Sequence, residues 1–274
     1  MNIQYILADP SGNKTILVTT PVEKCQHSTL AEKLLALPGT GAEQVGYLTM
    51  DEGKPLRVDM MGGEFCGNAS RSAAAYALKR SGESQGLYEV SCSGYDGVLQ
   101  AKVAAMTDGS YEAFIEMPYP ENVSALIMAV GDQPVRFFRV DLPGITHFVT
   151  FTNNLAGLDK NVYWQALQDY VADENLAAYG LVLCDTQKLT MIPAVYVRDT
   201  ATLYWEQSCG SGSAAVAAAL ACVNHQNVAC HLQQPGGRIA IAAKVGSDGD
   251  EKGRLQQIFI GGPITFSAEQ TIDI

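Results

Sequence analysis

Two cysteines, each followed directly by a glycine, are the residues of this chain best suited to chemistry. Cys66 precedes Gly67 and a run of small residues from Ser72 to Leu78, and Cys209 precedes Gly210 and a second small-residue run. This pattern predicts a turn and then a helix N-terminus, whose free N–H groups stabilise anions. Such a position lowers the pKa of a thiol and can also hold a carboxylate. We therefore expect two reactive thiols, each beside an anion-binding turn.

Two thiols that reach one substrate from opposite sides can invert a stereocentre. A thiolate removes a proton from one face of a carbon while a thiol returns a proton to the other face. The α-proton of an amino acid is weakly acidic, so preorganised backbone amides must stabilise the charge that develops. Neither cysteine motif contains a lysine for a Schiff base, and we predict a reaction without cofactors. The alternative for either cysteine alone is a helix-capping turn with a buried thiol.

The composition favours small-molecule chemistry in the cytoplasm. The chain has 274 residues and a formal net charge of -11, which argues against binding to nucleic acid or to an anionic membrane surface. We expect neither a secretion signal nor a membrane span, because the sequence has no apolar run of the roughly 18 residues needed. Seven cysteines without a disulfide-like framework fit reduced thiols.

The remaining cysteines have structural interpretations. Three of them lie in or beside strand-like stretches and are expected to be buried: Cys25, Cys92 and Cys184. Four residues have a spacing that invites comparison with a zinc site: Cys222, His225, Cys230 and His231. They lack the paired C-x-x-C and H-x-x-x-H pattern, so no metal is predicted.

The predicted elements give an α+β protein with an internal repeat. Short strands, a Cys-Gly turn, a helix and further strands follow one another twice, and the two cysteines are about half the chain length apart. Two prolines between Met117 and Asn122 suit a connection between domains. Because only the cores of the motifs match, two unrelated α+β halves remain an alternative.

Four segments resemble motifs of the diaminopimelate epimerase family of cofactor-independent two-base racemases. Ser11-Gly12-Asn13 resembles the family's N-terminal G-x-G-N turn, and Gly39 to Val45 resembles its G-x-G-A-D-Q segment. Cys66-Gly67-Asn68 and Cys209-Gly210-Ser211-Gly212 resemble its two cysteine motifs. The likeness covers nearly the whole chain. It implies two pseudo-symmetric domains, each a strongly curved β-sheet wrapped around a central helix, with residues 1–117 and 263–274 in one and 118–262 in the other.

The resemblance also implies roles for individual residues and a homodimer. Cys66 and Cys209 become the acid/base pair. Eight residues are expected around the substrate: Asn13, Gln44, Gly67, Asn68, His147, Glu206, Gly210 and Ser211. A strand histidine with its hydrogen bonds satisfied is the alternative for His147. Glu206 is expected to support the site or to bind a basic group of the substrate.

Departures from the family point away from diaminopimelate. The ligands that hold its second amino acid centre have no counterparts at five places: Met60, Met61, Ile145, Pro193 and the segment from Asp199 to Tyr204. An ionic end left unpaired in a site is costly, so we expect diaminopimelate to be rejected. The motif Met-x-Gly-Gly-Glu-Phe-Cys-Gly-Asn resembles the histidine racemases of this superfamily, which implies histidine as substrate. The alternatives are an epimerase of diaminopimelate or another amino acid, a PhzF-like isomerase that uses carboxylates, and a non-catalytic binding protein or thiol switch.

Overall fold

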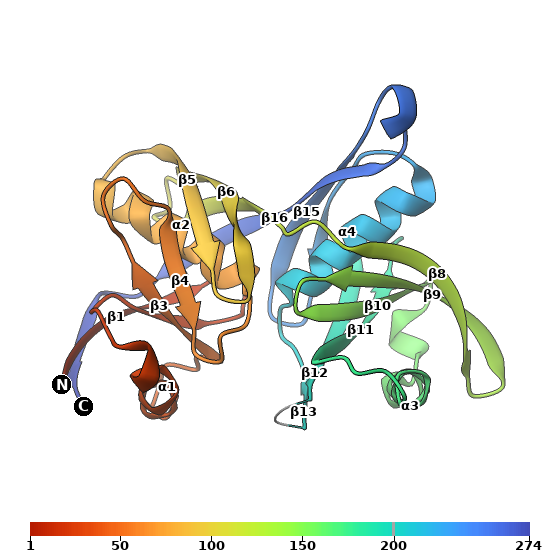
Figure 1. Cartoon of the computed structure of the whole chain (residues 1–274), viewed down its shortest axis with the longest axis horizontal. Helices are drawn as coiled ribbons and strands as arrows, with labels where there is room; N and C mark the ends of the chain where they lie inside the picture. Colours follow the sequence, from red (N-terminus) through yellow and green to blue (C-terminus); the bar gives the residue numbers. More distant parts are fainter. Residues whose placement is uncertain (199–200) are drawn as a thin grey trace. The chain divides into compact units, whose positions relative to one another are not determined.

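The computed structural model describes residues 1–198 and 201–274, which form two compact units (Figure 1). The N-terminal unit consists of Met1–Glu116 and Gly261–Ile274, and the C-terminal unit of Met117–Ile260. No helix among the described residues is both long enough and apolar enough to cross a membrane.

Strands of the N-terminal unit surround one helix. Its elements are β1 (Asn2–Asp9), β2 (Thr15–Val18), η1 (Lys24–Gln26), α1 (His27–Leu35), β3 (Gln44–Thr49), β4 (Leu56–Met60), α2 (Gly67–Ser81), β5 (Gln85–Cys92), β6 (Tyr95–Ala105), β7 (Tyr111–Glu116), the end of β16 (Leu255–Phe266) and β17 (Gln270–Asp273). The pairings run in order from β1 to β7, then from β7 to β16 and back to β1. Helix α2 contacts β2, β4, β5, β6 and β7, so the sheet curves around it. Buried alanines on α2 allow this close packing.

The C-terminal unit is built in a similar way. Its elements are β8 (Asn122–Val130), β9 (Gln133–Leu142), β10 (Ile145–Thr152), η2 (Leu155–Gly157), α3 (Lys160–Tyr170), β11 (Ala178–Asp185), β12 (Thr190–Val197), β13 (Thr202–Trp205), α4 (Gly210–Asn224), β14 (Val228–Gln233), β15 (Arg238–Val245), η3 (Gly249–Glu251) and the start of β16. Helix α4 contacts β8, β9, β10, β11, β14 and β15. Helix α3 packs on β8 and β11 through Trp164, whose ring stacks on Tyr179.

Both units contain the same order of strand pairings. In the N-terminal unit, β1–β2 is antiparallel, β2–β3 is parallel across α1, β3–β4 is antiparallel, β4–β5 is parallel across α2, and β5–β6 is antiparallel. In the C-terminal unit the same sequence of pairings is β9–β10, β10–β11 across α3, β11–β12, β12–β14 across α4, and β14–β15. Each cysteine-bearing helix is therefore a crossover between two parallel strands. The fold class is α+β.

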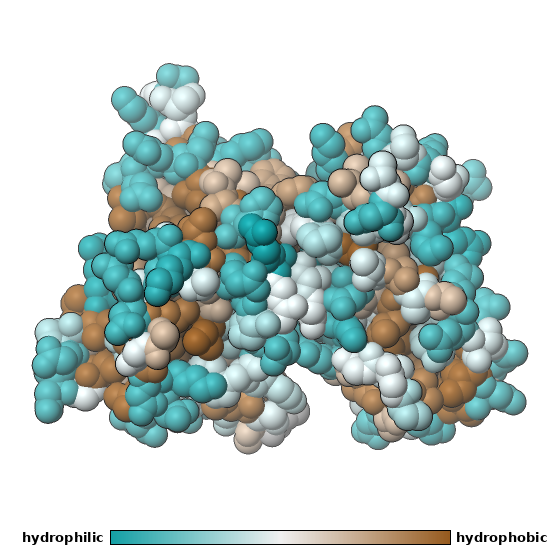
Figure 2. All heavy atoms as spheres, turned by 180° about the vertical axis from the view of Figure 1, so that it is seen from behind, coloured by the Kyte–Doolittle hydropathy of each residue, from teal (hydrophilic) through white to brown (hydrophobic). Residues whose placement is uncertain are grey.

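The surface and the structural cysteines complete the description of the fold. On the face shown in Figure 2, hydrophobic patches are interrupted by hydrophilic side chains. Cys92 and Cys184 are buried, as the sequence predicts. The prediction for Cys25 is wrong: it is exposed, because it lies in the short surface turn η1, which buries no residue.

Candidate active site

Cys66 caps the N-terminus of α2 with its side chain. Its backbone is extended (φ -136°, ψ 108°), and its Sγ accepts a hydrogen bond from the Ala69 N–H at 3.3 Å. The Ser70 hydroxyl donates to the Cys66 carbonyl at 2.8 Å. The helix ends at Gly82, which adopts the left-handed conformation (φ 72°) favoured by glycine. The cysteine thus occupies the position where a side chain satisfies a free N–H at a helix start.

Cys209 repeats this geometry at the start of α4. Its backbone is again extended (φ -115°, ψ 112°), and its Sγ accepts from the Gly212 N–H at 3.3 Å. The Ser213 hydroxyl donates to the Cys209 carbonyl at 2.6 Å. The serine four residues after each cysteine was missed by sequence reasoning, although the shared C-x-x-x-S spacing is visible in the sequence.

The predicted polar residues of the N-terminal unit gather around Cys66. Gln44 Nε2 lies 3.4 Å from Cys66 Sγ and 2.6 Å from Asn13 Oδ1. Asn68 Nδ2 donates to the same Asn13 oxygen at 3.5 Å. Asn13 and Asn68 are buried. Thr15, which was not predicted, accepts from Gln44 Nε2 at 2.9 Å.

The C-terminal cysteine has different neighbours. Ser211 Oγ lies 3.5 Å from Cys209 Sγ and 2.8 Å from His147 Nε2, so the two predicted residues form a line of contacts to the thiol. Gln234, which was not predicted, is buried and accepts from the Cys209 N–H at 2.7 Å. Its Nε2 donates to Ser213 Oγ at 2.8 Å. No sequence motif marks Gln234, because it follows a strand far along the chain.

His147 is held in a neutral environment. Its ring is fully buried, and burial lowers the pKa of His147 to about 3. Its Nδ1 has no hydrogen-bond partner within residues 1–198 and 201–274. The ring lies against Gly180, where a β-carbon would come within 2.4 Å of Nδ1. An unpaired acceptor is tolerated better than an unpaired donor, which favours the tautomer with the proton on Nε2, where the N–H donates to Ser211.

The expectation of acidified thiols is wrong. Burial raises the pKa of Cys66 to about 12, although the Ala69 N–H and the Gln44 amide act in the opposite direction. Burial also raises the pKa of Cys209 well above its usual value, and the charge of the neighbouring Glu206 raises it further. Desolvation of a thiolate outweighs one or two hydrogen bonds from amides. Both thiols are therefore protonated at neutral pH.

Glu206 is half-buried beside Cys209. Its backbone N–H donates to the Pro193 carbonyl at 3.0 Å, which fixes the segment just before the cysteine turn. The charge of its carboxylate, close to the Cys209 thiol, contributes to the raised pKa of that thiol. The structure thus places the predicted Glu206 next to the C-terminal cysteine.

Three of the positions that depart from the diaminopimelate epimerase pattern lie on strands: Met60 ends β4, Ile145 begins β10 and Pro193 lies in β12. Met60 and Pro193 are buried, and Ile145 is half-buried. Met61 packs on the hydrophobic cluster of the N-terminal unit. In the segment from Asp199 to Tyr204, Asp199 and Thr200 lie outside the described residues.

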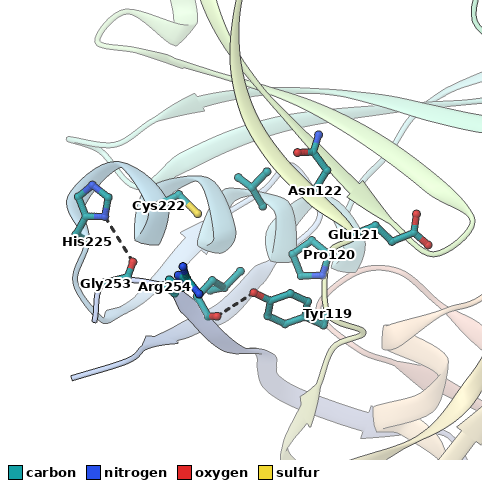
Figure 3. A pocket seen from close by; sticks show the side chains of 10 residues that line it. Tyr119, Pro120, Glu121, Asn122, Cys222, His225, Gly253 and Arg254 are labelled. Carbon is teal, nitrogen blue, oxygen red and sulfur yellow. Dashed lines mark hydrogen bonds between the residues drawn. The ribbon is translucent and has the colours of Figure 1, made fainter. Parts of the chain in front are cut away.

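A pocket of about 370 Å³ lies at the C-terminal end of α4 (Figure 3). Cys222 and His225 line it together with Tyr119 and Arg254, and the Tyr119 hydroxyl donates to the Leu255 carbonyl at 2.9 Å. Cys209 is at the other end of this helix, so the pocket contains none of the predicted site residues. Across residues 1–198 and 201–274, no three His, Cys, Asp or Glu side chains converge as a metal site would require.

Comparisons with known proteins identify the family. The chain matches the family described as histidine racemase CntK N-terminal domain over residues 2–272. A histidine racemase of Fusobacterium nucleatum subsp. nucleatum (strain ATCC 25586) is 30% identical over 278 residues, covering 99% of this chain and 97% of that protein. A histidine racemase of Staphylococcus aureus (strain Mu50) is 26% identical, covering 88% and 89% of the two chains.

A solved structure shows the fold at lower sequence identity. The Bacillus anthracis phenazine biosynthesis protein of the PhzF family superposes with a TM-score of 0.68 at 16% identity, covering 100% of this chain and 99% of that one. The family match and the relatives place the chain among isomerases of the racemase and epimerase class, as amino-acid racemases. This chain belongs to the histidine racemase family.

Proposed function

We propose that this protein is a cofactor-independent histidine racemase in which Cys66 and Cys209 act on opposite faces of the α-carbon. The observation that carries the proposal is the match between the two cysteine turns. Each thiol caps a helix of 15 residues, accepts the N–H three residues on, and is followed by a serine that binds its carbonyl. Two copies of so specific a turn fit two equivalent proton-transfer groups.

In this mechanism one cysteine is a thiolate and the other a thiol. The thiolate takes the α-proton, the electron pair stays on the α-carbon and its carboxylate, and the thiol donates its proton to the opposite face. The free N–H groups at the starts of α2 and α4 would hold the carboxylate as its charge increases. Because both thiols are protonated at neutral pH, one must first lose its proton, and the carboxylate of Glu206 is placed to accept it from Cys209. The product leaves the roles of the two sulfurs exchanged.

Histidine is the proposed substrate for two reasons. The curated relatives are named histidine racemases, and the chain lacks ligands for a second zwitterionic centre. Ile145 and Pro193 offer no polar side chain to a second carboxylate and ammonium. Leaving those charges unpaired would cost about 3 kcal/mol or more. An imidazole needs one donor and one acceptor, and Gln44 or Glu206 provides such groups.

Three further statements stay proposals. The common order of strand pairings supports two pseudo-symmetric domains, the resemblance to racemases supports a homodimer, and the composition supports a cytoplasmic location. The PhzF-like alternative has the support of the fold alone, since the identity to that structure is 16%.

The experiment compares two substrates on one preparation. L-Histidine and LL-diaminopimelate are incubated separately in heavy water, and kcat/KM is measured by chiral analysis with deuterium incorporation at the α-carbon. We expect histidine to be favoured by more than about a hundredfold, which corresponds to the cost of the unpaired charges. A preference for diaminopimelate would contradict the assignment of substrate. Absence of α-deuteration with every amino acid would remove the racemase mechanism itself.

A further inference from the structure

A connected line of hydrogen-bonded side chains crosses the N-terminal unit between two charged residues. Arg71 Nε donates to Asn68 Oδ1 at 3.1 Å, and Asn68 Nδ2 donates to Asn13 Oδ1 at 3.5 Å. Asn13 Nδ2 in turn donates to Glu43 Oε2 at 2.9 Å. Two neutral amides thus lie between a guanidinium and a carboxylate.

The charged ends dictate which way each amide points. A guanidinium can only donate, so Asn68 must turn its oxygen to Arg71 and its NH₂ group to Asn13. An ionised carboxylate can only accept, so Asn13 must turn its NH₂ group to Glu43 and its oxygen inward. Both ends impose the same direction on the line, and each hydrogen bond to a charged group is stronger than one between neutral groups.

The orientation of the Asn13 amide determines which end of the Gln44 amide faces Cys66. Because the Asn13 oxygen faces inward, Gln44 must approach it with Nε2, at 2.6 Å. The same nitrogen is 3.4 Å from Cys66 Sγ and 2.9 Å from Thr15 Oγ1. Its two hydrogens thus serve three acceptors, and one of them is available to the sulfur when it carries charge. If Gln44 were turned over, its oxygen would face Cys66 and would favour the protonated thiol instead.

The two ends of the line are anchored very differently. Arg71 is fully buried, and its other nitrogens donate to the Gly262 carbonyl at 2.9 Å and to Ser11 Oγ at 3.2 Å. Burial lowers the pKa of Arg71 to about 10, which leaves it a cation at neutral pH. Glu43 is exposed and contributes through its carboxylate. Glu43 is therefore the end that can be altered without opening the core.

We propose that Arg71 and Glu43 are positioning residues, which orient the Asn68, Asn13 and Gln44 amides so that Gln44 presents an N–H, not an oxygen, to Cys66. Neither residue touches the reacting atoms in this scheme. The inference rests on the proposed role of Cys66 as an acid/base group, but the orientation of Gln44 can be tested without turnover.

Charge repulsion alone predicts that loss of Glu43 changes the reactivity of Cys66 in the opposite direction from this proposal. Removing the negative charge of Glu43 would by itself make a nearby thiolate easier to form. Shortening the side chain would also make the region around Cys66 more open to a reagent. If Glu43 acts by orienting the amide line, its loss instead frees Gln44 to turn its oxygen to the sulfur, and the thiolate becomes harder to form. A slower reaction of the thiol is therefore diagnostic.

The test is the rate at which iodoacetamide alkylates Cys66 at pH 8.5, followed by mass spectrometry of the peptide that contains it. Alkylation requires the thiolate, so the rate reports its population. We expect Glu43→Ala to slow the alkylation of Cys66 about threefold. Loss of one hydrogen bond makes the thiolate rarer, while the higher pKa makes each thiolate more nucleophilic and offsets part of this loss. Glu32→Ala, which removes an exposed carboxylate from α1 of the same unit, should leave the rate unchanged.

A double-mutant cycle shows whether Glu43 acts through Gln44. Gln44→Met removes the donor to the sulfur, so adding Glu43→Ala to that variant should cause no further slowing. An unchanged or faster rate in Glu43→Ala alone would overturn the proposal, and so would a further slowing in the double variant. Racemase assays on the same proteins would fail separately if the proposed function were wrong, because alkylation needs no substrate.

Discussion

The two units have the same cysteine turn, but their polar residues occupy different positions along the parallel strands that precede it: β2 and β3 in one unit, β10 and β11 in the other. In the N-terminal unit, Leu17 of β2 is opposite Gly46 of β3. In the C-terminal unit, the corresponding pair is His147 of β10 and Gly180 of β11. The imidazole next to Ser211 therefore takes the place of a leucine, and a glycine faces both side chains.

Two residues earlier on the same strands, the polar side chains are in the N-terminal unit and the apolar ones in the C-terminal unit. Thr15 and Gln44 are opposite each other in the N-terminal unit, and they form the hydrogen bonds beside Cys66. The corresponding positions of the C-terminal unit hold Ile145 and Ala178, which have no polar side chains. The Cys66 sulfur thus faces the Gln44 amide, whereas the Cys209 sulfur has the Ser211 hydroxyl, which His147 contacts in turn, and the Glu206 carboxylate nearby. Equal turns with unequal neighbours predict two thiols that share a reaction but differ in how each proton is held.

Replacing either cysteine distinguishes the roles of the two thiols and has the largest expected effect on the rate of racemisation. Cys66→Ala and Cys209→Ala should each reduce racemisation by at least about a thousandfold, since each removes one of the two proposed proton-transfer groups. The remaining cysteine can still remove the α-hydrogen from one enantiomer and return deuterium to the same face. Exchange without inversion in heavy water should therefore be confined to one enantiomer in each variant, and to opposite enantiomers in the two.

Chiral analysis with deuterium counting measures both quantities, and thermal unfolding shows that each variant is folded. Exchange of the same enantiomer in both variants would show that the thiols do not act on opposite faces. Full activity in either variant would leave the matched turns without a catalytic role.

Glycines at the corresponding strand positions should differ in what they tolerate. A β-carbon at Gly180 would be 2.4 Å from the His147 ring and 2.9 Å from the Ala194 carbonyl, whereas at Gly46 its nearest neighbour is a Val58 methyl at 3.1 Å. Gly180→Ala should lower the free energy of unfolding by about 2 kcal/mol, because a backbone atom cannot move away easily. Gly46→Ala should cost less than about 1 kcal/mol. Urea unfolding measures both, and equal losses would show that the His147 ring and the Ala194 carbonyl can both shift to make room for the methyl group.

The sequence predicts those parts of the fold and site whose causes are local. Cys-Gly followed by small residues predicts the two helix starts, and apolar stretches predict most strands. Strand β8 was not predicted, although the Gly131-Asp132 turn that joins it to β9 is typical of a hairpin. Gln234 and Arg71 take part through contacts with residues distant in sequence, which no local pattern reports. The thiol pKa values were expected in the wrong direction because burial is a property of the folded chain.

Acid stability offers the finest test of the difference between His147 and Leu17. Burial lowers the pKa of His147 to about 3, so the folded protein keeps this ring neutral while an unfolded chain binds a proton near pH 6.5. Well above pH 6.5 the ring is neutral in both states, so its protonation does not change the free energy of unfolding. As pH falls from 6.5 toward 3, the free energy of unfolding should decrease by up to about 1.4 kcal/mol per unit, since the unfolded state takes up one more proton.

His147→Leu, which copies the N-terminal unit, should remove this part of the slope. His231→Leu, on an exposed position of β14, should leave it unchanged. Urea unfolding at a series of pH values between 4 and 7 measures the slopes, and equal slopes in wild type and His147→Leu would show that the imidazole is charged in the folded protein.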